Sequence, residues 1–190
     1  MQKNYIIAGV GGQGILSMAA IIDVTAMNSG LYVKQAEVHG MSQRGGSVEA
    51  HLRISDTEIF SDIIPLGEAD CIIATEPMEA LRYIPFLKEH GTIITASKSL
   101  INCANYPDKE VLDKELQSKI HCITIDADAI ALSCGSIKTS NIVILGAASN
   151  YLGIDEAQYI QAIKTLFASK GTDIVNMNIC AFSKGREYKN

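Results

Sequence analysis

The stretch that decides the fold is Tyr5-Ile6-Ile7-Ala8-Gly9-Val10-Gly11-Gly12-Gln13-Gly14. A short apolar run that ends in glycines predicts a buried strand leading directly into a tight turn. The apolar residues that follow, beginning with Ile15 and Leu16, recur at helical spacing to about Ser29. This order of strand, glycine turn and helix predicts a Rossmann-like first βα unit.

The glycines of this turn fit the pattern G-x-G-x-x-G through Gly9, Gly11 and Gly14. Glycines let the backbone approach a diphosphate, while the N–H groups and the dipole of the following helix favour negative charge. We therefore expect the turn, with Gly12 and Gln13, to bind a phosphate-bearing ligand. The alternative is that the glycines only permit a tight crossing from strand to helix, with Gly12 and Gln13 serving packing.

A dinucleotide site is a second possibility for the turn, because Glu37 follows Gly14 at a spacing that suits an acidic residue for ribose hydroxyls. Such a site predicts an NAD(P)-linked dehydrogenase domain. Against this, the second predicted strand, Tyr32 to Val38, leads into a polar loop and not into a helix. The NAD hypothesis is therefore kept as an alternative and not as the leading interpretation.

The rest of the chain predicts a single α/β domain over residues 1–190. Residues 48–54 alternate between apolar and polar, which predicts a strand with one buried and one wet face, and residues 58–61 are expected to pair with it in an antiparallel hairpin. From Asp70 onward, strands alternate with helices, which predicts a mainly parallel sheet in a three-layer architecture. Ile142 to Ala148 is apolar on all sides, so this helix is expected in the core or in a subunit contact.

A second glycine segment, Met41-Ser42-Gln43-Arg44-Gly45-Gly46, follows the second predicted strand. A guanidinium beside exposed backbone N–H groups suits an anion clamp, in which Ser42, Arg44, Gly45 and Gly46 take part. A surface turn with a solvated arginine explains the same residues. His39, which precedes the segment, is interpreted as a structural hydrogen bonder and not as a catalytic group.

Composition indicates which kinds of partner and which cell compartment suit the chain. Of the 190 residues, 47% are hydrophobic and 19% are charged, which leaves apolar surface for a partner chain. The net charge is -5, and the sequence contains no basic block that could bind nucleic acid. No apolar stretch is long enough to span a bilayer, and the N-terminus has no signal-peptide pattern. The five cysteines form no CxxC pair, which favours reduced thiols in a cytoplasmic protein without its own metal site.

Several catalytic patterns are absent from the sequence, including the phosphate loop G-x-x-x-x-G-K-[ST] and the elbow G-x-S-x-G. Asp126 and Asp128 lie at the end of a predicted strand, where they are expected to cap the next helix. No catalytic residue is assigned, and the chain is not expected to act as an enzyme alone.

Two motifs together resemble a known family: the Gly-Gly-Gln-Gly turn at residues 11–14 and the segment from Ala36 to Val48, which contains Arg44-Gly45-Gly46. The chain resembles, over its whole length, the γ-type subunits of 2-oxoacid:ferredoxin oxidoreductases. Within that family, the lead-in Glu37 to Gln43 favours the indolepyruvate members over the pyruvate and 2-oxoglutarate members.

The resemblance implies a complex that decarboxylates an aryl 2-oxoacid, transfers the acyl group to coenzyme A and passes electrons to ferredoxin. In that family, thiamine diphosphate and the iron–sulfur clusters belong to a large partner subunit. This chain would assemble with that subunit, or form a homodimer in isolation, and offer its two glycine segments to an anion such as the coenzyme A phosphates. A non-catalytic interaction module, whose glycines serve only packing, is the remaining alternative.

Overall fold

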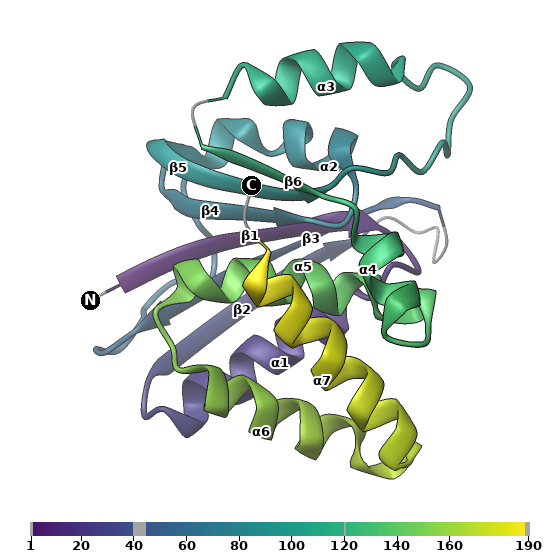
Figure 1. Ribbon diagram of the computed structural model, residues 1–190. Helices are drawn as coiled ribbons and strands as arrows, with labels where there is room; N and C mark the ends of the chain where they lie inside the picture. Colours follow the sequence, from purple (N-terminus) through teal and green to yellow (C-terminus); the bar gives the residue numbers. More distant parts are fainter. Residues whose placement is uncertain (1, 40–44, 120, 189–190) are drawn as a thin grey trace.

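The computed structural model describes residues 2–39, 45–119 and 121–188, and their strands form one six-stranded sheet (Figure 1). The strands of these residues are β1 (Gln2–Val10), β2 (Tyr32–His39), β3 (Ser47–Ser55), β4 (Ala69–Ala74), β5 (Leu87–Ala96) and β6 (Cys122–Ile125). The α-helices are α1 (Ile15–Asn28), α2 (Pro77–Arg82), α3 (Lys109–Gln117), α4 (Ala127–Ser133), α5 (Ser140–Leu152), α6 (Glu156–Phe167) and α7 (Thr172–Glu187).

The strand order is β2-β3-β1-β4-β5-β6, so β1, the first strand in the chain, lies inside the sheet. The pairs β1–β4, β4–β5 and β5–β6 are parallel, and β3 is antiparallel to both β1 and β2. Helices α2 and α3 cover one face, and α1 and α5 cover the other, with α6 and α7 packed behind them (Figure 1). The predicted three-layer fold and the Rossmann-like first βα unit are confirmed.

The central strands are apolar on both sides because helices cover both faces of the sheet. Along β1, Tyr5 and Ile7 belong to the core on the side of α1 and α5, whereas Ile6 and Ala8 belong to the core on the side of α2. The helix predicted over Ile142–Ala148 is part of α5, and its residues lie in the larger core. Its apolar residues therefore serve the interior of the domain.

The predicted hairpin partner of β3 is wrong. Residues 58–61 form no strand, and the antiparallel partner of β3 on its outer side is β2, from Tyr32 paired with Ser55 to His39 paired with Val48. The predicted wet face of β3 is also wrong at His51, which is 3% exposed. The connection that follows β3 covers this face, and the backbone N–H of Ile64 donates to His51 Nδ1 at 3.1 Å.

The expectation of five reduced thiols is wrong as well, because Cys134 and Cys180 form a disulfide. Cys134 follows α4 and Cys180 lies in α7, and these two helices pack against each other although the cysteines are 46 positions apart in sequence. That proximity is created by the fold, so spacing along the chain could not reveal it. The other three cysteines do not take part in this disulfide: Cys71 is buried, Cys103 is exposed and Cys122 is half-buried.

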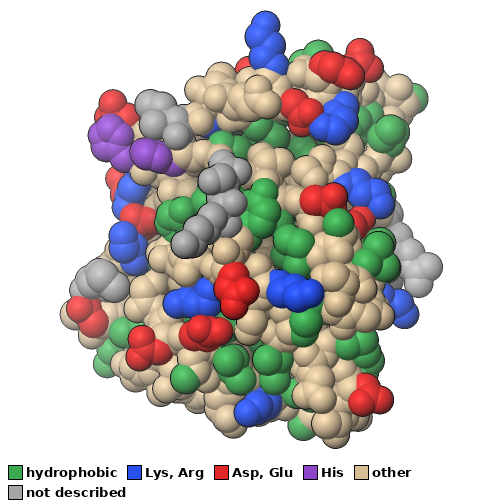
Figure 2. Space-filling view, viewed as in Figure 1, with side chains coloured by type: hydrophobic (Ala, Val, Ile, Leu, Met, Phe, Trp, Pro, Cys, Tyr) green, Lys and Arg blue, Asp and Glu red, His purple; other side chains and the backbone are tan. Residues whose placement is uncertain are grey.

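The surface agrees with the charge pattern of the sequence. Figure 2 shows positive and negative side chains interspersed on the face in view, without a field of one sign. Among the helices of the described residues, none combines the length and the hydropathy needed to cross a membrane.

Candidate ligand-binding site

The glycine turn lies where β1 ends and α1 begins, and its backbone requires glycine at two positions. Gly12 has φ 103° and Gly14 has φ 77°, both in the region that favours glycine. Gly14 is the N-cap residue of α1, and its carbonyl accepts from the N–H groups of Ser17 and Met18. A Cβ on Gly14 would also lie 2.5 Å from Nδ2 of Asn141. Both the backbone conformation and the close contact with Asn141 therefore require glycine at position 14.

Gln13 holds the turn in place with its side chain. Its Oε1 accepts from the N–H of Val10 at 2.8 Å and from the hydroxyl of Thr75 at 2.8 Å. Its Nε2 donates to the carbonyl of Thr75 at 3.4 Å. The amide of Gln13 thus ties the end of β1 to the end of β4.

The second glycine segment lies directly against the first. The N–H of Gly11 donates to the carbonyl of Gly46 at 2.8 Å, and the N–H of Gly45 donates to the carbonyl of Gly11 at 3.4 Å. Asn102 adds a third element, because its Nδ2 donates to the carbonyl of Gly45 at 2.9 Å. Ser42 and Arg44, which the sequence assigns to the same site, lie outside the described residues. The fold brings Gly45 and Gly46 to the glycine turn.

A cleft of about 650 Å³ opens beside the turn. It lies at the carboxyl ends of the parallel strands, with Thr75 after β4, Lys98 after β5 and Asp128 after β6. Because α1 covers one face of the sheet and α2 covers the other, the crevice between β1 and β4 is a topological switch point, the usual ligand site of open α/β sheets. Gly12, Gln13 and Gly14 form part of its wall.

The opposite wall is the N-terminal end of α5 with the short helical turn Ile137–Thr139 before it. Nδ2 of Asn141 donates to the carbonyl of Gly14 at 3.1 Å, so the N-terminal ends of α1 and α5 meet at the cleft. Sequence reasoning missed this wall. The signal present in the sequence is the segment Ser136 to Asn141, polar except for Ile137, immediately before the apolar residues of α5.

The cleft combines positive charge with apolar surface. Lys138 and Lys170 line it, and Lys98 forms an ion pair with Asp128 at 2.8 Å. That hydrogen-bonded pair raises the pKa of Lys98. The apolar lining comes from α5, α6 and α7, and includes Ile142, Phe167, Ile174 and Met177. Such a cleft suits a ligand that has an anionic group and an apolar or aromatic part.

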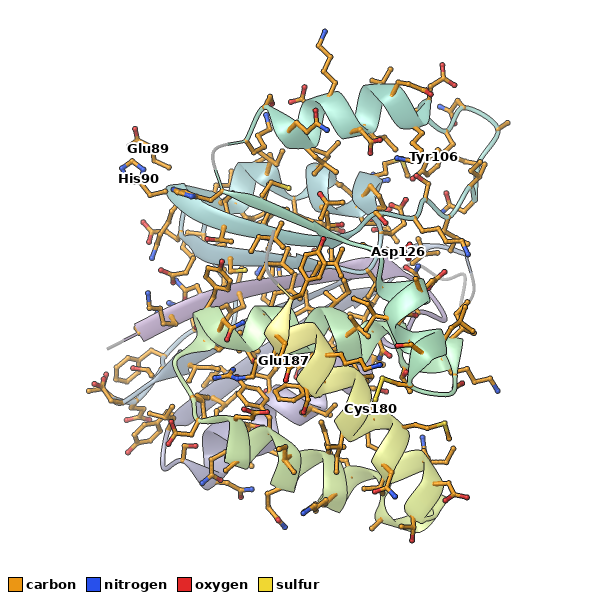
Figure 3. The ribbon with its side chains drawn as sticks, in the orientation of Figure 1. Glu89, His90, Tyr106, Asp126, Cys180 and Glu187 are labelled. Carbon is orange, nitrogen blue, oxygen red and sulfur yellow. A yellow bond between two sulfur atoms is a disulfide. The ribbon has the colours of Figure 1, made fainter. Side chains whose placement is uncertain are left out.

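Two buried glutamates lie on the other side of the sheet from α1 and fix the loops around the site. Glu76 accepts from the N–H groups of Glu79 and Leu100 and from the hydroxyl of Tyr106. Glu79 accepts from the hydroxyl of Ser47, the residue after the second glycine segment. Burial and the bond to Glu76 raise the pKa of Tyr106. Figure 3 shows Tyr106 at the same end of the molecule as Asp126, opposite Glu89 and His90.

The structure places Asp126 at the helix cap that the sequence predicts, and it places Glu37 away from the glycine turn. The side chain of Asp126 caps α4 by accepting from the N–H of Ala129 at 3.0 Å, as predicted. Glu37 and His39 are exposed on β2. Because β3 lies between β2 and β1, Glu37 is one strand farther from the glycine turn than a dinucleotide site requires. Among the described residues, no group of three His, Cys, Asp or Glu is arranged to hold a metal ion.

Comparison with known proteins agrees with the resemblance seen in the motifs. Residues 4–188 match the family described as pyruvate ferredoxin/flavodoxin oxidoreductase. The chain is 39% identical to the indolepyruvate oxidoreductase subunit IorB of Archaeoglobus fulgidus and 36% identical to that of Pyrococcus horikoshii, in each case over 97% of this chain and 94% of the relative.

Solved structures share the fold. The γ subunit of a keto/oxoacid ferredoxin oxidoreductase from Geobacter sulfurreducens is 23% identical, with a TM-score of 0.70 over 97% of this chain and 96% of that chain. The 2-oxoglutarate:ferredoxin oxidoreductase from Magnetococcus marinus, solved with 2-oxoglutarate, coenzyme A and succinyl-CoA bound, is 21% identical. Its TM-score is 0.78, over 97% of this chain and 30% of that longer chain.

Proposed function

The chain belongs to the pyruvate ferredoxin/flavodoxin oxidoreductase family, and we propose on this basis that it is the small subunit of an indolepyruvate:ferredoxin oxidoreductase. One observation carries the choice of substrate. Four relatives named indolepyruvate oxidoreductase subunit IorB are 35% to 39% identical over 97% of this chain. Relatives named for 2-oxoglutarate or for pyruvate and ketoisovalerate are 28% to 29% identical.

The reaction we assign to the complex is the oxidative decarboxylation of an aryl 2-oxoacid. The bond between the carboxylate and the oxo carbon breaks and releases CO₂, the acyl group forms a thioester with coenzyme A, and the released electron pair reduces ferredoxin. The large subunit supplies thiamine diphosphate and the iron–sulfur clusters for these steps. We place the complex in the cytoplasm. The part of this chain is to assemble with the large subunit and to bind an anionic group.

We assign the anion site to the glycine turn, Gly9 to Gly14, and the segment Ser42 to Gly46, with the coenzyme A phosphates as the ligand. The bonds between Gly11 and both Gly45 and Gly46 support this proposal, because they bring two glycine segments to the N-terminal end of a 14-residue helix. Lys138 and Lys170 in the neighbouring cleft add positive charge. The apolar residues of the cleft suit the remainder of an amphiphilic ligand.

The experiment that tests the function is coexpression of this chain with a large subunit of an indolepyruvate:ferredoxin oxidoreductase, followed by an assay of electron transfer to ferredoxin or a viologen dye. We expect coenzyme A-dependent reduction with indolepyruvate, and a higher kcat/KM for it than for pyruvate or 2-oxoglutarate. A higher kcat/KM for either of the latter would reassign the substrate, and failure to assemble would reject the subunit role.

The anion site is tested separately by calorimetry on the assembled complex. Removing a charge-assisted contact costs about 1.5 to 3 kcal/mol, so Arg44→Ala should weaken coenzyme A binding by about tenfold or more. Lys114→Ala, at an exposed position of α3, is the matched control and should leave the affinity unchanged. Equal affinities of Arg44→Ala and the unaltered complex would remove coenzyme A from this site.

A further inference from the structure

The connection between β3 and β4, residues 56–68, presents three large apolar side chains to solvent; we refer to it as the 56–68 loop. Phe60 is 88% exposed, Leu66 is 67% exposed and Ile63 is 49% exposed. Single exposed apolar residues are ordinary on protein surfaces. Three of them within one short connection form a local patch, which marks a contact surface more often than a scattered residue does.

The patch is held in a defined shape by bonds to the sheet. Nη1 of Arg53 donates to the carbonyls of Ser61 at 2.8 Å and Ile63 at 3.2 Å. Ile59 and Ile64 are buried and anchor the loop beneath these bonds. Phe60 and Ile63 therefore point outward from a loop whose adjacent residues are fixed. Little conformational freedom remains to be lost when such a loop binds a partner.

The charge of the loop indicates which partner fits it. The loop also exposes the carboxylates of Glu58, Asp62 and Glu68, and residues 56–68 contain no lysine or arginine. Arg53 lies beneath the loop, where it donates to loop carbonyls. A second copy of this chain that docked symmetrically through the same patch would bring these carboxylates against each other. An apolar pocket rimmed by basic residues is complementary to the patch.

The location of the patch leaves the ligand cleft open. Ser55, the last residue of β3, pairs with Gln2 at the start of β1, whereas the glycine turn follows the end of β1. The 56–68 loop thus lies at the end of the central strands where β1 begins, and the cleft lies at their other end (Figure 1). A partner bound to the loop does not have to compete with a ligand at the glycine turn.

We propose that the 56–68 loop docks the chain onto the large subunit of the complex, with Phe60 and Leu66 inserted into an apolar pocket whose rim carries lysine or arginine. This inference rests on the proposed function, because it takes the large subunit as the occupant. Beyond that function, the inference specifies the surface that binds the large subunit, the side chains that anchor it and the charge of the complementary site.

The test is the affinity of the large subunit for variants of the full chain, measured by titration of separately purified subunits. Phe60→Ser and Leu66→Ser should each raise the Kd by at least about tenfold, and their melting temperatures should stay near that of the unaltered chain because both side chains are exposed. The matched control is Ile101→Ser, because Ile101 is 76% exposed and follows the carboxyl end of β5, away from the 56–68 loop. This variant should bind the large subunit normally.

Charge provides a second measurement. The double variant Glu58→Lys with Asp62→Lys should also bind more weakly, and the difference should shrink as salt concentration rises. Unchanged Kd values for Phe60→Ser and Leu66→Ser would overturn the docking proposal while the subunit role stands. If the unaltered chain did not bind the large subunit, the proposed function itself would fail. Loss of a homodimer, with binding to the large subunit unaffected, would assign the patch to a second copy.

Discussion

At the scale of single residues, Gln13 shows how one side chain can hold a turn in place. Its amide joins the N–H of Val10 to both the hydroxyl and the carbonyl of Thr75. The sequence places Gln13 in the glycine turn but does not show that Thr75, 62 positions away, is its partner. The two residues meet because β1 and β4 are neighbours in the sheet.

We expect Gln13→Ala to destabilise the protein, because the N–H of Val10 and the hydroxyl of Thr75 both lose their bonds to the side-chain oxygen. Partly buried polar groups left unsatisfied cost about 1 to 3 kcal/mol in the free energy of unfolding. Urea denaturation measures this loss. Gln117→Ala, at an exposed position of α3, is the control, and equal stability of the two variants would contradict a structural role for Gln13.

Asp23 carries the second prediction at this scale. Burial, with a smaller contribution from the charge of Glu37, raises the pKa of Asp23 to about 6, and its Oδ1 has no hydrogen-bond partner among the described residues. The folded protein therefore holds this proton more tightly than the unfolded chain does. Stability due to this group is present below about pH 4 and is lost as the pH rises to about 6.

Asp23→Asn should remove that pH dependence and stabilise the protein at pH 7 by about 1 kcal/mol, a figure reduced for partial exposure to solvent. The measurement is the free energy of unfolding at a series of pH values from 4 to 8. The exposed Asp62→Asn serves as the control. Parallel pH profiles for Asp23→Asn and the unaltered protein would show that Asp23 ionises normally in the folded state.

At the scale of elements, α5 and α7 approach each other through two glycines. A Cβ on Gly146 would lie 2.1 Å from the carbonyl oxygen of Phe182, and one on Gly185 would lie 2.0 Å from that of Val143. Gly146 belongs to the helix that the sequence predicts to be apolar on all sides. The structure identifies α7 as the neighbouring helix.

Gly146→Ala should therefore destabilise the protein although alanine favours helices. The backbones of α5 and α7 would have to separate, which costs about 1 to 3 kcal/mol or more in overpacked cores. Thermal denaturation measures the effect, and Asn176→Ala, at an exposed position of α7, is the control. A melting temperature for Gly146→Ala at or above that of the unaltered protein would contradict the close contact.

The antiparallel part of the sheet shows that the alternation of apolar and polar residues predicts a strand but not the strands with which it pairs. The period-2 pattern of residues 48–54 predicted β3 correctly, but the partner was sought in the next segment of the chain. The partners are β2 before it and β1, the first strand of the chain. Alternation specifies which face of a strand is apolar and does not specify its neighbours.

At the scale of the whole molecule, the Cys134–Cys180 disulfide joins α4 to α7 beside the cleft, where Ser136 and Met177 form part of the lining. Closing a loop of 46 residues restricts the unfolded chain by about 4 kcal/mol in the entropy model. Dithiothreitol should therefore lower the melting temperature of the protein. The variant with Cys134→Ser and Cys180→Ser should melt at a lower temperature with or without reductant.

Cys103→Ser provides the control, because Cys103 is an exposed free cysteine and its replacement should leave the response to reductant intact. Free-thiol titration under denaturing conditions without reductant should find three reactive thiols, which are Cys71, Cys103 and Cys122. Five reactive thiols together with an unchanged melting temperature in dithiothreitol would contradict the disulfide.

The sequence by itself determined the local elements and the first βα unit, because the glycines of the turn, the apolar strands and the all-apolar helix α5 are properties of neighbouring residues. It also indicated the family through two short motifs. Only the tertiary structure decided that Gly11 bonds to Gly45 and Gly46, that Asn141 closes the cleft against Gly14, and that β3 separates Glu37 from the turn. These relations depend on strand order and helix packing, which bring distant residues together through contacts that local periodicity does not encode.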